Sequence, residues 1–295
     1  MRIAVATFEG MPHEFGGDDR LLVRELERRG AEVTHAPWTD PEVDWSGHEL
    51  VIARSPWDYS RRHAEFVEWA HSVEAPLENA AELIAWNSDK RYLGDLGEEG
   101  LPVVPTTFVG AGDPLPEIDS QVVVKPTISA GARDTGRFGP ESARAGLALV
   151  ERIRERGEVA MVQPFIATVE SHGETAIVAI DGRVSHVLHK SPVLKADEVA
   201  PVRDDALGAA ESMYDPGLVV DGSAEPDQLR LAERTLAVLE RRFGDAPLIA
   251  RVDMLRDEAG DPVLLELEAI EPNLYFEHAP GAAERLADAV IARAR

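Results

Sequence analysis

Three carboxylates and one guanidinium occupy alternate positions of two strand-like segments near the C-terminus. Arg251 and Asp253 belong to the first segment, and Glu266 and Glu268 belong to the second. Alternate side chains of a strand point to one face, so two neighbouring strands would present all four groups together. Clustered carboxylates repel one another unless a cation lies among them, and magnesium selects such oxygen ligands. The pattern predicts a divalent metal site, although a solvated face of an antiparallel sheet would show the same alternation.

Lysine is rare in this chain, since its 30 basic residues include only Lys90, Lys125, Lys190 and Lys195. Lys125 ends an apolar strand-like run and precedes residues 127–136, which are small, polar and glycine-containing. An ammonium beside such a loop can approach phosphate oxygens together with backbone N–H groups. Lys90 stands in the first turn of a predicted helix, where its charge opposes the helix dipole unless a phosphate is its partner. Both are candidates for phosphate binding, against the alternative of ordinary surface lysines.

A possible adenosine-binding connector follows a predicted strand. The segment Gln163–Ile166 leaves this strand and is followed by Glu170. Such a connector can offer backbone groups to an adenine edge, an apolar ring to its face and a carboxylate to ribose hydroxyls. Taken alone, the segment is equally compatible with an ordinary strand exit.

Four residues are candidates for binding a substrate. Arg54 stands at the end of a predicted strand and Arg133 belongs to the loop 127–136, so both guanidinium groups could meet a carboxylate. Glu271 and Asn273 follow the second acidic strand and could receive an amino group. Each of the four is also compatible with a structural or surface role.

The elements that would position these residues begin with alternating strands and helices. The first predicted strands span residues 2–7, 31–37 and 49–54. Asp18 and Asp19 are predicted to cap a helix that runs through Arg29. Such alternation predicts a parallel sheet covered by helices. Ligands of these sheets bind beyond the C-terminal strand ends, which places residues 8–17 and 54–59 on the binding rim.

The remainder of the chain mixes helices with antiparallel hairpins. Asp181-Gly182 between two alternating segments is a strong hairpin signal. The segment 191–223 has little periodicity, which is typical of a functional lid or of disorder. Further strands are predicted at residues 105–109, 121–125, 159–163, 174–180, 183–190, 248–255 and 262–268, and helices at residues 88–99, 140–156 and 226–243.

Composition limits the classes of function. A chain of 295 residues that is 44% hydrophobic can bury the cores of about two domains. Its net charge of -24 predicts no binding to nucleic acid or to an anionic membrane. The absence of cysteine excludes disulfides, thiolate metal sites and a thiol nucleophile. No signal peptide or long apolar stretch is evident, which favours a cytoplasmic location, and neither a dinucleotide fingerprint nor a Walker loop occurs.

The order of these motifs resembles the ATP-grasp superfamily of ligases. The matching set is Lys90, Val123–Pro126 with its loop, Gln163–Ile166 with Glu170, Arg251–Asp253 and Glu266–Glu268. The resemblance implies a mixed α/β and α+β ATP-grasp fold, with ATP held between two α+β subdomains. It implies an N-terminal parallel-sheet domain over residues 1–86, a small lid subdomain over residues 87–166 and a large subdomain with the metal site over residues 167–295.

The resemblance also implies which residues bind the nucleotide. The implied set is Lys90, Lys125, Ser129, Gly131, Gln163, Phe165, Ile166, Glu170 and Lys190. Gln163 stands where many members have glutamate, which keeps an acceptor for the adenine amine but removes its charge.

Metal binding and catalysis are implied for the acidic strands. Asp253, Glu266 and Glu268 would bind two magnesium ions, with manganese as an alternative. Arg251 and Lys125 would be catalytic, and Arg251 would stabilise charge on the transferring phosphoryl group and on the tetrahedral intermediate. Glu268 stands where many ligases have asparagine, which adds charge at the metal site.

A narrower similarity is to the branch that contains the O-ureido-serine cyclo-ligase of cycloserine biosynthesis. It is carried by residues 54–59, 86–92, 125–135 and 266–272. The resemblance implies that ATP converts an amino acid carboxylate to an acyl phosphate, and that an internal nitrogen then closes a ring with loss of carbon dioxide and ammonia. The implied partners are ATP and a small amino acid derivative, with a homo-oligomer left open. Two alternatives are an intermolecular ligase similar to glutathione synthetase and a nucleotide-binding module without turnover.

Overall fold

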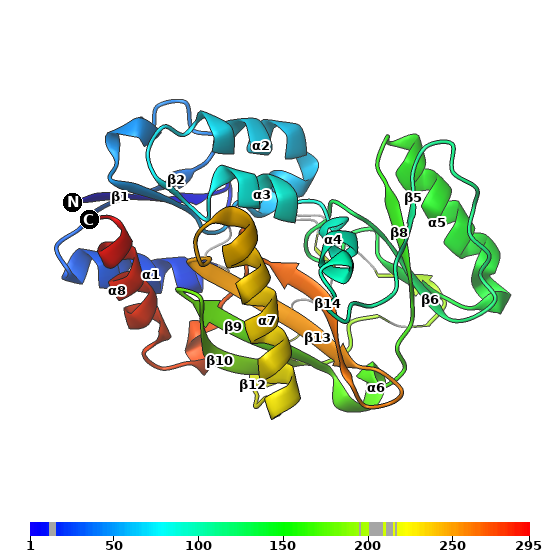
Figure 1. Cartoon of the computed structure of the whole chain (residues 1–295). Helices are drawn as coiled ribbons and strands as arrows, with labels where there is room; N and C mark the ends of the chain where they lie inside the picture. Colours follow the sequence, from blue (N-terminus) through cyan, green and yellow to red (C-terminus); the bar gives the residue numbers. More distant parts are fainter. Residues whose placement is uncertain (12–15, 195, 201–208, 211–214, 216) are drawn as a thin grey trace.

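Three β-sheets organise the part of the chain that the computed structural model describes (Figure 1). The described residues are 1–11, 16–194, 196–200, 209–210, 215 and 217–295. Lys195, residues 12–15 of the predicted rim and part of the predicted lid segment 191–223 therefore lie outside the described residues.

The first sheet is parallel and belongs to the N-terminal unit. Its strand order is β2 (Glu32–Pro37), β1 (Arg2–Thr7), β3 (Leu50–Ala53) and β4 (Leu77–Glu78). Helices α1 (Gly17–Arg28) and α8 (Ala282–Arg293) cover one face, and α2 (His63–Ser72) and α3 (Ala81–Asn87) cover the other (Figure 1). Because both faces are covered, the central strand carries apolar side chains at every position from Ile3 to Ala6, all of them buried.

The second sheet is antiparallel and carries the acidic strands. Its strand order is β12 (Val219–Asp221), β10 (Arg183–Lys190), β9 (Glu174–Ile180), β13 (Ile249–Arg256) and β14 (Pro262–Glu268). Helix α7 (Pro226–Phe243) packs on one face of this sheet (Figure 1). The turn between β9 and β10 has positive φ at both Asp181 (52°) and Gly182 (69°), as a two-residue hairpin of this type requires.

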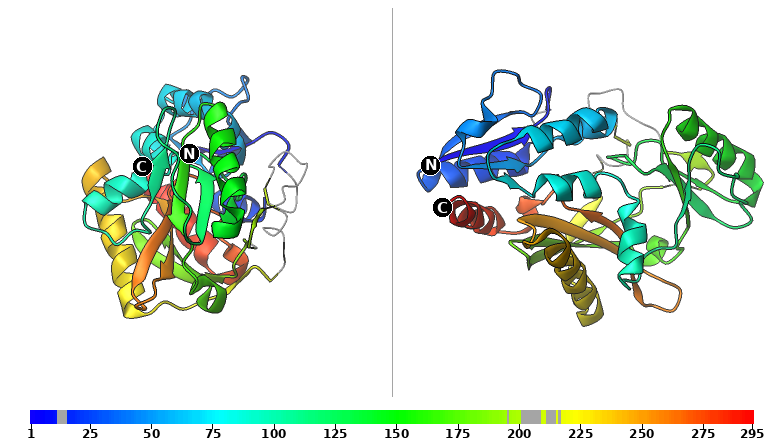
Figure 2. Two further views of the ribbon diagram at one scale, coloured as in Figure 1. Left: turned by 90° about the vertical axis from the view of Figure 1, so that its right-hand side faces the viewer. Right: turned by 45° about the horizontal axis from the view of Figure 1, so that its top comes forward.

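The third sheet forms a lobe at the far end of the molecule from the termini (Figures 1 and 2). Its strand order is β11 (Glu198–Val199), β7 (Gly136–Phe138), β6 (Val122–Pro126), β8 (Ala160–Pro164) and β5 (Thr107–Val109), with α5 (Ala143–Glu155) on one face. The short helix α4 (Tyr92–Glu98) precedes this sheet, and α6 (Val169–His172) follows β8. Single helical turns lie at Trp45–Gly47, Trp57–Arg61, Pro140–Ser142 and Phe276–His278.

The expected strands and long helices lie where the sequence predicts them, with several corrections. The helix predicted at residues 88–99 is shorter and begins at Tyr92. Asp18 and Asp19 lie inside the first turn of α1 and make no capping bond, because both carboxylates face other segments. Patterning missed the short strands β4, β7, β11 and β12 and the helices α2, α3, α6 and α8. The domain limits at residues 86 and 166 stay predictions, and α8 returns from the last segment to pack on α1.

No helix among the described residues is both long and apolar enough to cross a membrane.

Two buried asparagines join the N-terminal unit to the second sheet. Asn79 donates to the carbonyls of Ile249 (2.8 Å) and Ala269 (2.6 Å) and accepts from the N–H of Leu248 (2.7 Å). Asn87 likewise donates to the carbonyl of Leu267 at 2.8 Å and accepts from the N–H of Ala269 at 2.7 Å. Buried backbone groups need such partners, so these side chains fix how β13 and β14 meet the N-terminal unit.

We expect Asn79→Ala to lower the free energy of unfolding by roughly 2–4 kcal/mol, because it leaves three buried backbone groups without a partner. Urea unfolding measures this change. Glu117→Ala, at an exposed position, is the control and should change stability by less than about 0.5 kcal/mol. Equal stability of the two variants would contradict the assigned role of Asn79.

Candidate active site

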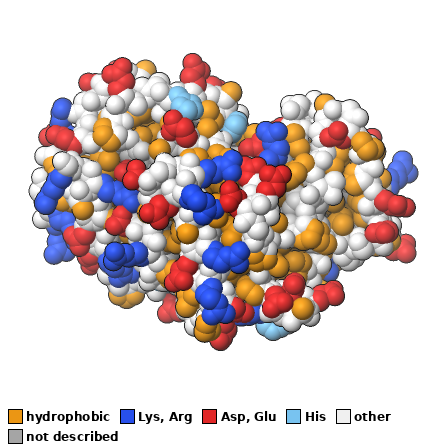
Figure 3. Space-filling model, in the orientation of Figure 1, with side chains coloured by type: hydrophobic (Ala, Val, Ile, Leu, Met, Phe, Trp, Pro, Cys, Tyr) orange, Lys and Arg blue, Asp and Glu red, His pale blue; other side chains and the backbone are white. Residues whose placement is uncertain are grey.

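A cavity of about 820 Å³ is lined by residues from all three structural units. This volume lies in the upper part of the range typical of ligand sites. Figure 3 shows the face of Figure 1 hollowed at its upper edge between the N-terminal lobe and the lobe that carries α5. The predicted site residues that line the cavity are Lys90, Lys125, Ser129, Gly131, Gln163, Phe165, Ile166, Lys190, Arg251, Glu266, Glu268, Glu271 and Asn273.

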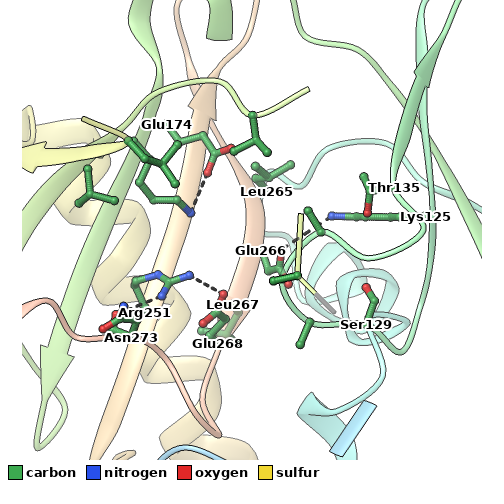
Figure 4. Close-up of a pocket in the computed structure, with 18 of the residues that line it drawn as sticks. Lys125, Ser129, Thr135, Glu174, Arg251, Leu265, Glu266, Leu267, Glu268 and Asn273 are labelled. Atoms are coloured by element: carbon green, nitrogen blue, oxygen red, sulfur yellow. Dashed lines mark hydrogen bonds and ion pairs between the residues drawn. The ribbon is translucent and has the colours of Figure 1, made fainter. Parts of the chain in front are cut away.

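One cluster of charges lies across β13, β14 and the adjacent hairpin. The strand register pairs Arg251 with Glu268, and their side chains form an ion pair (Figure 4). The Arg251 Nε donates to Asp253 Oδ1 at 2.9 Å. Lys190 Nζ lies 2.8 Å from Asp253 and 2.9 Å from Glu174. Two cations and three carboxylates therefore form one network of ion pairs, which has one negative charge in excess when all five groups are ionised.

A second cluster joins the acidic strand β14 to the third sheet. Glu266 Oε1 lies 3.1 Å from Lys90 Nζ, and Glu266 Oε2 lies 3.7 Å from Lys125 Nζ. Figure 4 shows Lys125 and Glu266 pointing toward each other from the two sides of the cavity. Lys90 also donates to the carbonyl of Ser129 at 2.7 Å, which holds the start of the loop 127–136. Both lysines thus lie beside the loop and the acidic strand.

The neighbouring Lys and Arg side chains determine which of these carboxylates are ionised at neutral pH. Burial alone would raise the pKa of Asp253, but Arg251 and Lys190 hold it well below its usual range. Burial opposes ionisation of Glu266 as well, and Lys90 and Lys125 lower its pKa in the same way. Both carboxylates therefore carry a full negative charge at neutral pH.

Two other groups of the same clusters shift toward their neutral forms. Burial lowers the pKa of Lys125, because the single carboxylate of Glu266 at 3.7 Å does not offset desolvation. The pKa of Glu268 is raised, first by burial and then by the charges of Asp253 and Glu266, although Arg251 opposes the shift. Lys125 and Glu268 would each gain from a ligand of opposite charge.

The acidic residues offer the donors that a hard divalent cation selects. Glu266 and Glu268 line the cavity from alternate positions of β14. Asp253 departs from the prediction, because it is 2% exposed, does not line the cavity and has its oxygens bonded to Arg251 and Lys190. Within the described residues, no three Asp, Glu or His side chains come close enough together to hold an ion. The two glutamates therefore fit a metal better than the predicted trio does.

The predicted adenosine connector lines the cavity at its other end, in the third sheet. Gln163 donates from its amide nitrogen to the hydroxyl of Thr106 at 2.9 Å, which fixes how the side chain is turned. Glu170 does not line the cavity, since its exposed carboxylate pairs with Arg137 at 2.6 Å. The Arg137 guanidinium lies 3.5 Å from the centre of the Phe165 ring, so it anchors this ring from outside the cavity.

Neither arginine that was predicted to bind substrate lines the cavity. Arg54 is 1% exposed, and its Nε lies 3.2 Å from Asp19. Arg133 donates to the carbonyl of Ser60 at 3.4 Å, and so joins the loop 127–136 to the N-terminal unit. Sequence position identified both side chains as strand-end or loop cations but could not show these contacts. The contacts leave Nε and Nη1 of Arg54 and Nε of Arg133 buried without a hydrogen-bond partner.

Glu271 is a buried carboxyl group in the wall of the cavity. Burial and the charge of Glu268 raise the pKa of Glu271 to about 8, although Lys90 and a hydrogen bond with Tyr59 oppose the shift. The indole N–H of Trp57 donates to the carbonyl of Glu271 at 3.0 Å. The side chain is therefore held in place and mostly neutral at pH 7.

Several cavity residues were not predicted from the sequence. Glu174 faces Lys190 across the hairpin, and Tyr275 lines the cavity in a left-handed backbone conformation with φ of 51°. Trp57 and Tyr59 line it from the turn that follows β3. Trp57 and Tyr59 belong to the predicted binding rim at residues 54–59, whereas Tyr275 follows the second acidic strand without a pattern that singles it out.

Comparison with known proteins gives three related matches. Residues 3–79 match the family model described as the N-terminal domain of the D-cycloserine synthetase DcsG. The cycloserine biosynthesis protein DcsG of Streptomyces lavendulae is 34% identical over 286 residues, which cover 92% of each chain. A crystal structure of D-cycloserine synthetase DcsG superposes with a TM-score of 0.88 at 31% identity, over the full length of both chains.

More distant structures share the fold. A D-alanine–D-alanine ligase of Bacillus anthracis complexed with ATP has a TM-score of 0.66 at 13% identity, covering 100% of this chain and 97% of the ligase. An ATP-grasp protein with a RimK domain from Sphaerobacter thermophilus has a TM-score of 0.65 at 17% identity, covering 99% of this chain and 100% of that one. Identity and coverage together show that the chain belongs to the DcsG family of ATP-grasp ligases.

Proposed function

We propose that this ligase activates the carboxylate of a small amino acid derivative as an acyl phosphate and then closes a ring within the same molecule. A substrate carboxylate oxygen attacks the γ-phosphorus of ATP, and ADP leaves. A nitrogen of the substrate then attacks the acyl carbon, and inorganic phosphate leaves. In an O-ureido-serine-like substrate this nitrogen carries a carbamoyl group, which one water molecule converts to carbon dioxide and ammonia. The product is a cycloserine-like ring.

The observation that carries this proposal is the meeting of lysines and glutamates in one cavity. Lys90 and Lys125 face Glu266 from the side of the third sheet, beside the loop 127–136. A triphosphate in this place would pair with the lysines, while the glutamates would accept divalent cations. We assign Lys90, Lys125 and Lys190 to phosphate binding, with Ser129 and Gly131 in the covering loop.

The acidic strands would hold the metal. Glu266 and Glu268 would be direct ligands, and Asp253 would support Glu268 through Arg251, which contacts both carboxylates. Two magnesium ions, or manganese in their place, would neutralise phosphate charge. Because its chemistry is phosphoryl transfer followed by acyl transfer, the enzyme needs no protein nucleophile, which agrees with the absence of cysteine.

Arg251 is the residue we assign to charge stabilisation. It lines the cavity, it is 5% exposed, and its carboxylate neighbours raise its pKa although burial opposes this. A permanently charged, immobile guanidinium stabilises charge that develops on the phosphoryl group or on the tetrahedral intermediate without reorganisation.

The remaining cavity residues suggest where the two substrates lie. Gln163, Phe165 and Ile166 lie at the end formed by the third sheet, where we place adenosine. Glu271 and Asn273 lie at the end nearest the N-terminal unit, where we place the amino acid. A neutral Glu271 would accept or donate a hydrogen bond there, and a substrate ammonium group would favour its ionised form.

The direct test is ADP formation by the purified enzyme with magnesium, ATP and a panel of amino acid derivatives. Cyclisation requires that one substrate suffices, and that phosphate, ammonia and a cyclic product appear in equal amounts. A requirement for a second amine before phosphate is released would instead indicate an intermolecular ligase. Proximity favours the ring closure, because an internal nitrogen reacts at a high effective concentration.

Glu266→Gln should lower turnover at least about 100-fold, because it removes a metal-binding charge from the reacting region. Circular dichroism and thermal melting should show an intact fold. Glu277→Gln makes the same chemical change at an exposed residue of the cavity wall and should keep near-normal activity. Near-normal turnover of Glu266→Gln would remove this residue from the metal site.

Lys125→Met should weaken ATP binding roughly tenfold or more, because a charge-assisted contact to phosphate is lost. Calorimetric titration with a non-hydrolysable ATP analogue and magnesium measures the dissociation constant. Arg144→Met, on the exposed side of α5, removes a positive charge from the same lobe and serves as the control. An unchanged dissociation constant in Lys125→Met would exclude this lysine from the phosphate site.

Glu271→Gln should make the protein without ligands less sensitive to pH. The folded state keeps a proton on Glu271 up to a pKa of about 8, whereas the unfolded chain releases it near the ordinary value of 4.5. Stability of the wild type should therefore fall between about pH 5 and pH 8, on the order of 1 kcal/mol per pH unit. Thermal melts of both proteins across this range measure the difference. A stability difference that stays constant with pH would contradict the raised pKa.

A further inference from the structure

The segment that follows β14 is held by one carboxylate of the N-terminal unit. Asp18 Oδ2 accepts from the backbone N–H of Leu274 at 2.7 Å and from that of Tyr275 at 2.9 Å. Asp18 Oδ1 accepts from the N–H of Phe276 at 2.9 Å. Asp18 itself is 5% exposed and lies in the first turn of α1. One side chain therefore binds three consecutive backbone donors, the first of which lies 256 residues further along the chain.

The same segment bonds directly to Arg251. The carbonyl of Asn273 accepts from Arg251 Nη1 at 3.1 Å, one residue before the backbone that Asp18 holds. Tyr275 has a φ of 51°, a conformation that non-glycine residues adopt only where surrounding contacts impose it. Asp18 supplies such contacts on both sides of this residue. The carbonyl of Asn273 thus helps to hold the Arg251 guanidinium, together with the carboxylates of Asp253 and Glu268, and it connects this group to the backbone that Asp18 binds.

Arg54 provides the charge that lets Asp18 stay buried. Its Nη2 lies 3.7 Å from Asp18, and its Nε lies 3.2 Å from Asp19. Asp19 also bonds to Ser55, at the end of β3. Buried charges such as Asp18, Asp19 and Arg54 are costly unless they are paired and hydrogen-bonded. Asp19 bonds within the N-terminal unit, whereas Asp18 reaches across to the active site.

We propose that Asp18 is a positioning residue for the reaction, which it serves by fixing residues 273–276 and, through them, Arg251. The proposal rests on the role assigned to Arg251 above. Asp18 reaches the cavity wall, but backbone N–H groups occupy both of its oxygens. The N-terminal unit would then control catalysis at the second sheet without supplying a group that reacts.

Asp18→Asn tests the proposal, with Asp19→Asn as its matched control. Both carboxylates are buried in the same turn of α1 beside Arg54, but only Asp18 contacts residues 274–276. The amide that replaces the carboxylate in Asp18→Asn has a single acceptor oxygen, so at least one backbone donor loses its partner. We expect Asp18→Asn to lower kcat about 10- to 100-fold, because small misplacements at the reacting centre have effects of this size. The KM for ATP should stay within about twofold of the wild type, since we place adenosine at the other end of the cavity.

The control separates positioning from general destabilisation. We expect Asp19→Asn to lower the melting temperature as much as Asp18→Asn does while keeping kcat within about twofold. Asp18→Glu keeps the charge beside Arg54 and displaces it by one methylene group, so it tests positioning if Asp18→Asn does not fold. Near-normal kcat in the folded Asp18 variants, or an equal loss in Asp19→Asn, would overturn the proposal.

Amide hydrogen exchange tests the anchoring without reference to turnover. Leu274, Tyr275 and Phe276 should exchange slowly in the wild type and in Asp19→Asn, and faster in the Asp18 variants. Exchange of these three amides at the unprotected rate in the wild type would refute the anchoring. If the wild type formed no ADP with any substrate, the proposed function would fail, while the exchange result would still report on the segment.

Discussion

The whole site depends on how carboxylates on two neighbouring strands are neutralised. Asp253 and Glu266 are opposite each other in the β13–β14 ladder, where two ionised groups would repel. Arg251 and Lys190 neutralise Asp253 from within the sheet, whereas Lys90 and Lys125 reach Glu266 from the far side of the cavity. The second pairing also holds the third sheet against the second. A charged ligand that entered the cavity would therefore change both the local charge and the contact between the two sheets.

This arrangement gives a physical reason for the unusual use of lysine. In a chain with a net charge of -24, Lys90, Lys125 and Lys190 all line the cavity. Basic and acidic side chains are interspersed over the face drawn in Figure 3. A compact ammonium with rotatable donors can exchange a carboxylate for a phosphate oxygen, and its pKa responds to burial. We expect Arg251 to keep the same partners, and its guanidinium group is planar and permanently charged. The three described lysines thus stand where partners would change, and Arg251 stands where they would not.

Sequence patterns predicted the parts of this structure that depend on local rules. The turn residues Asp181 and Gly182 identified the hairpin, and strand alternation placed Arg251 beside Asp253 on one face. The partners of buried charges could not be predicted, because they lie far apart in sequence: Arg54 pairs with Asp19, and Glu170 pairs with Arg137. The irregular register between Val184 and His186 also sets Glu174 opposite Lys190, and a turn motif alone gives no sign of such a shift.

Asp18 shows how a residue can be correctly noticed and wrongly interpreted, whereas the substrate-binding role of Arg54 stays a prediction. Both stand on the edge of the parallel sheet where ligands commonly bind, so their sequence positions suggested substrate binding and helix capping. In the fold this edge faces the segment after β14, and its groups bind that backbone. The binding edge of the N-terminal unit thus takes a segment of its own chain as a partner. It follows that changes in the N-terminal unit would alter the end of the cavity where we place the amino acid, while the end where we place the phosphates would depend on the other two sheets.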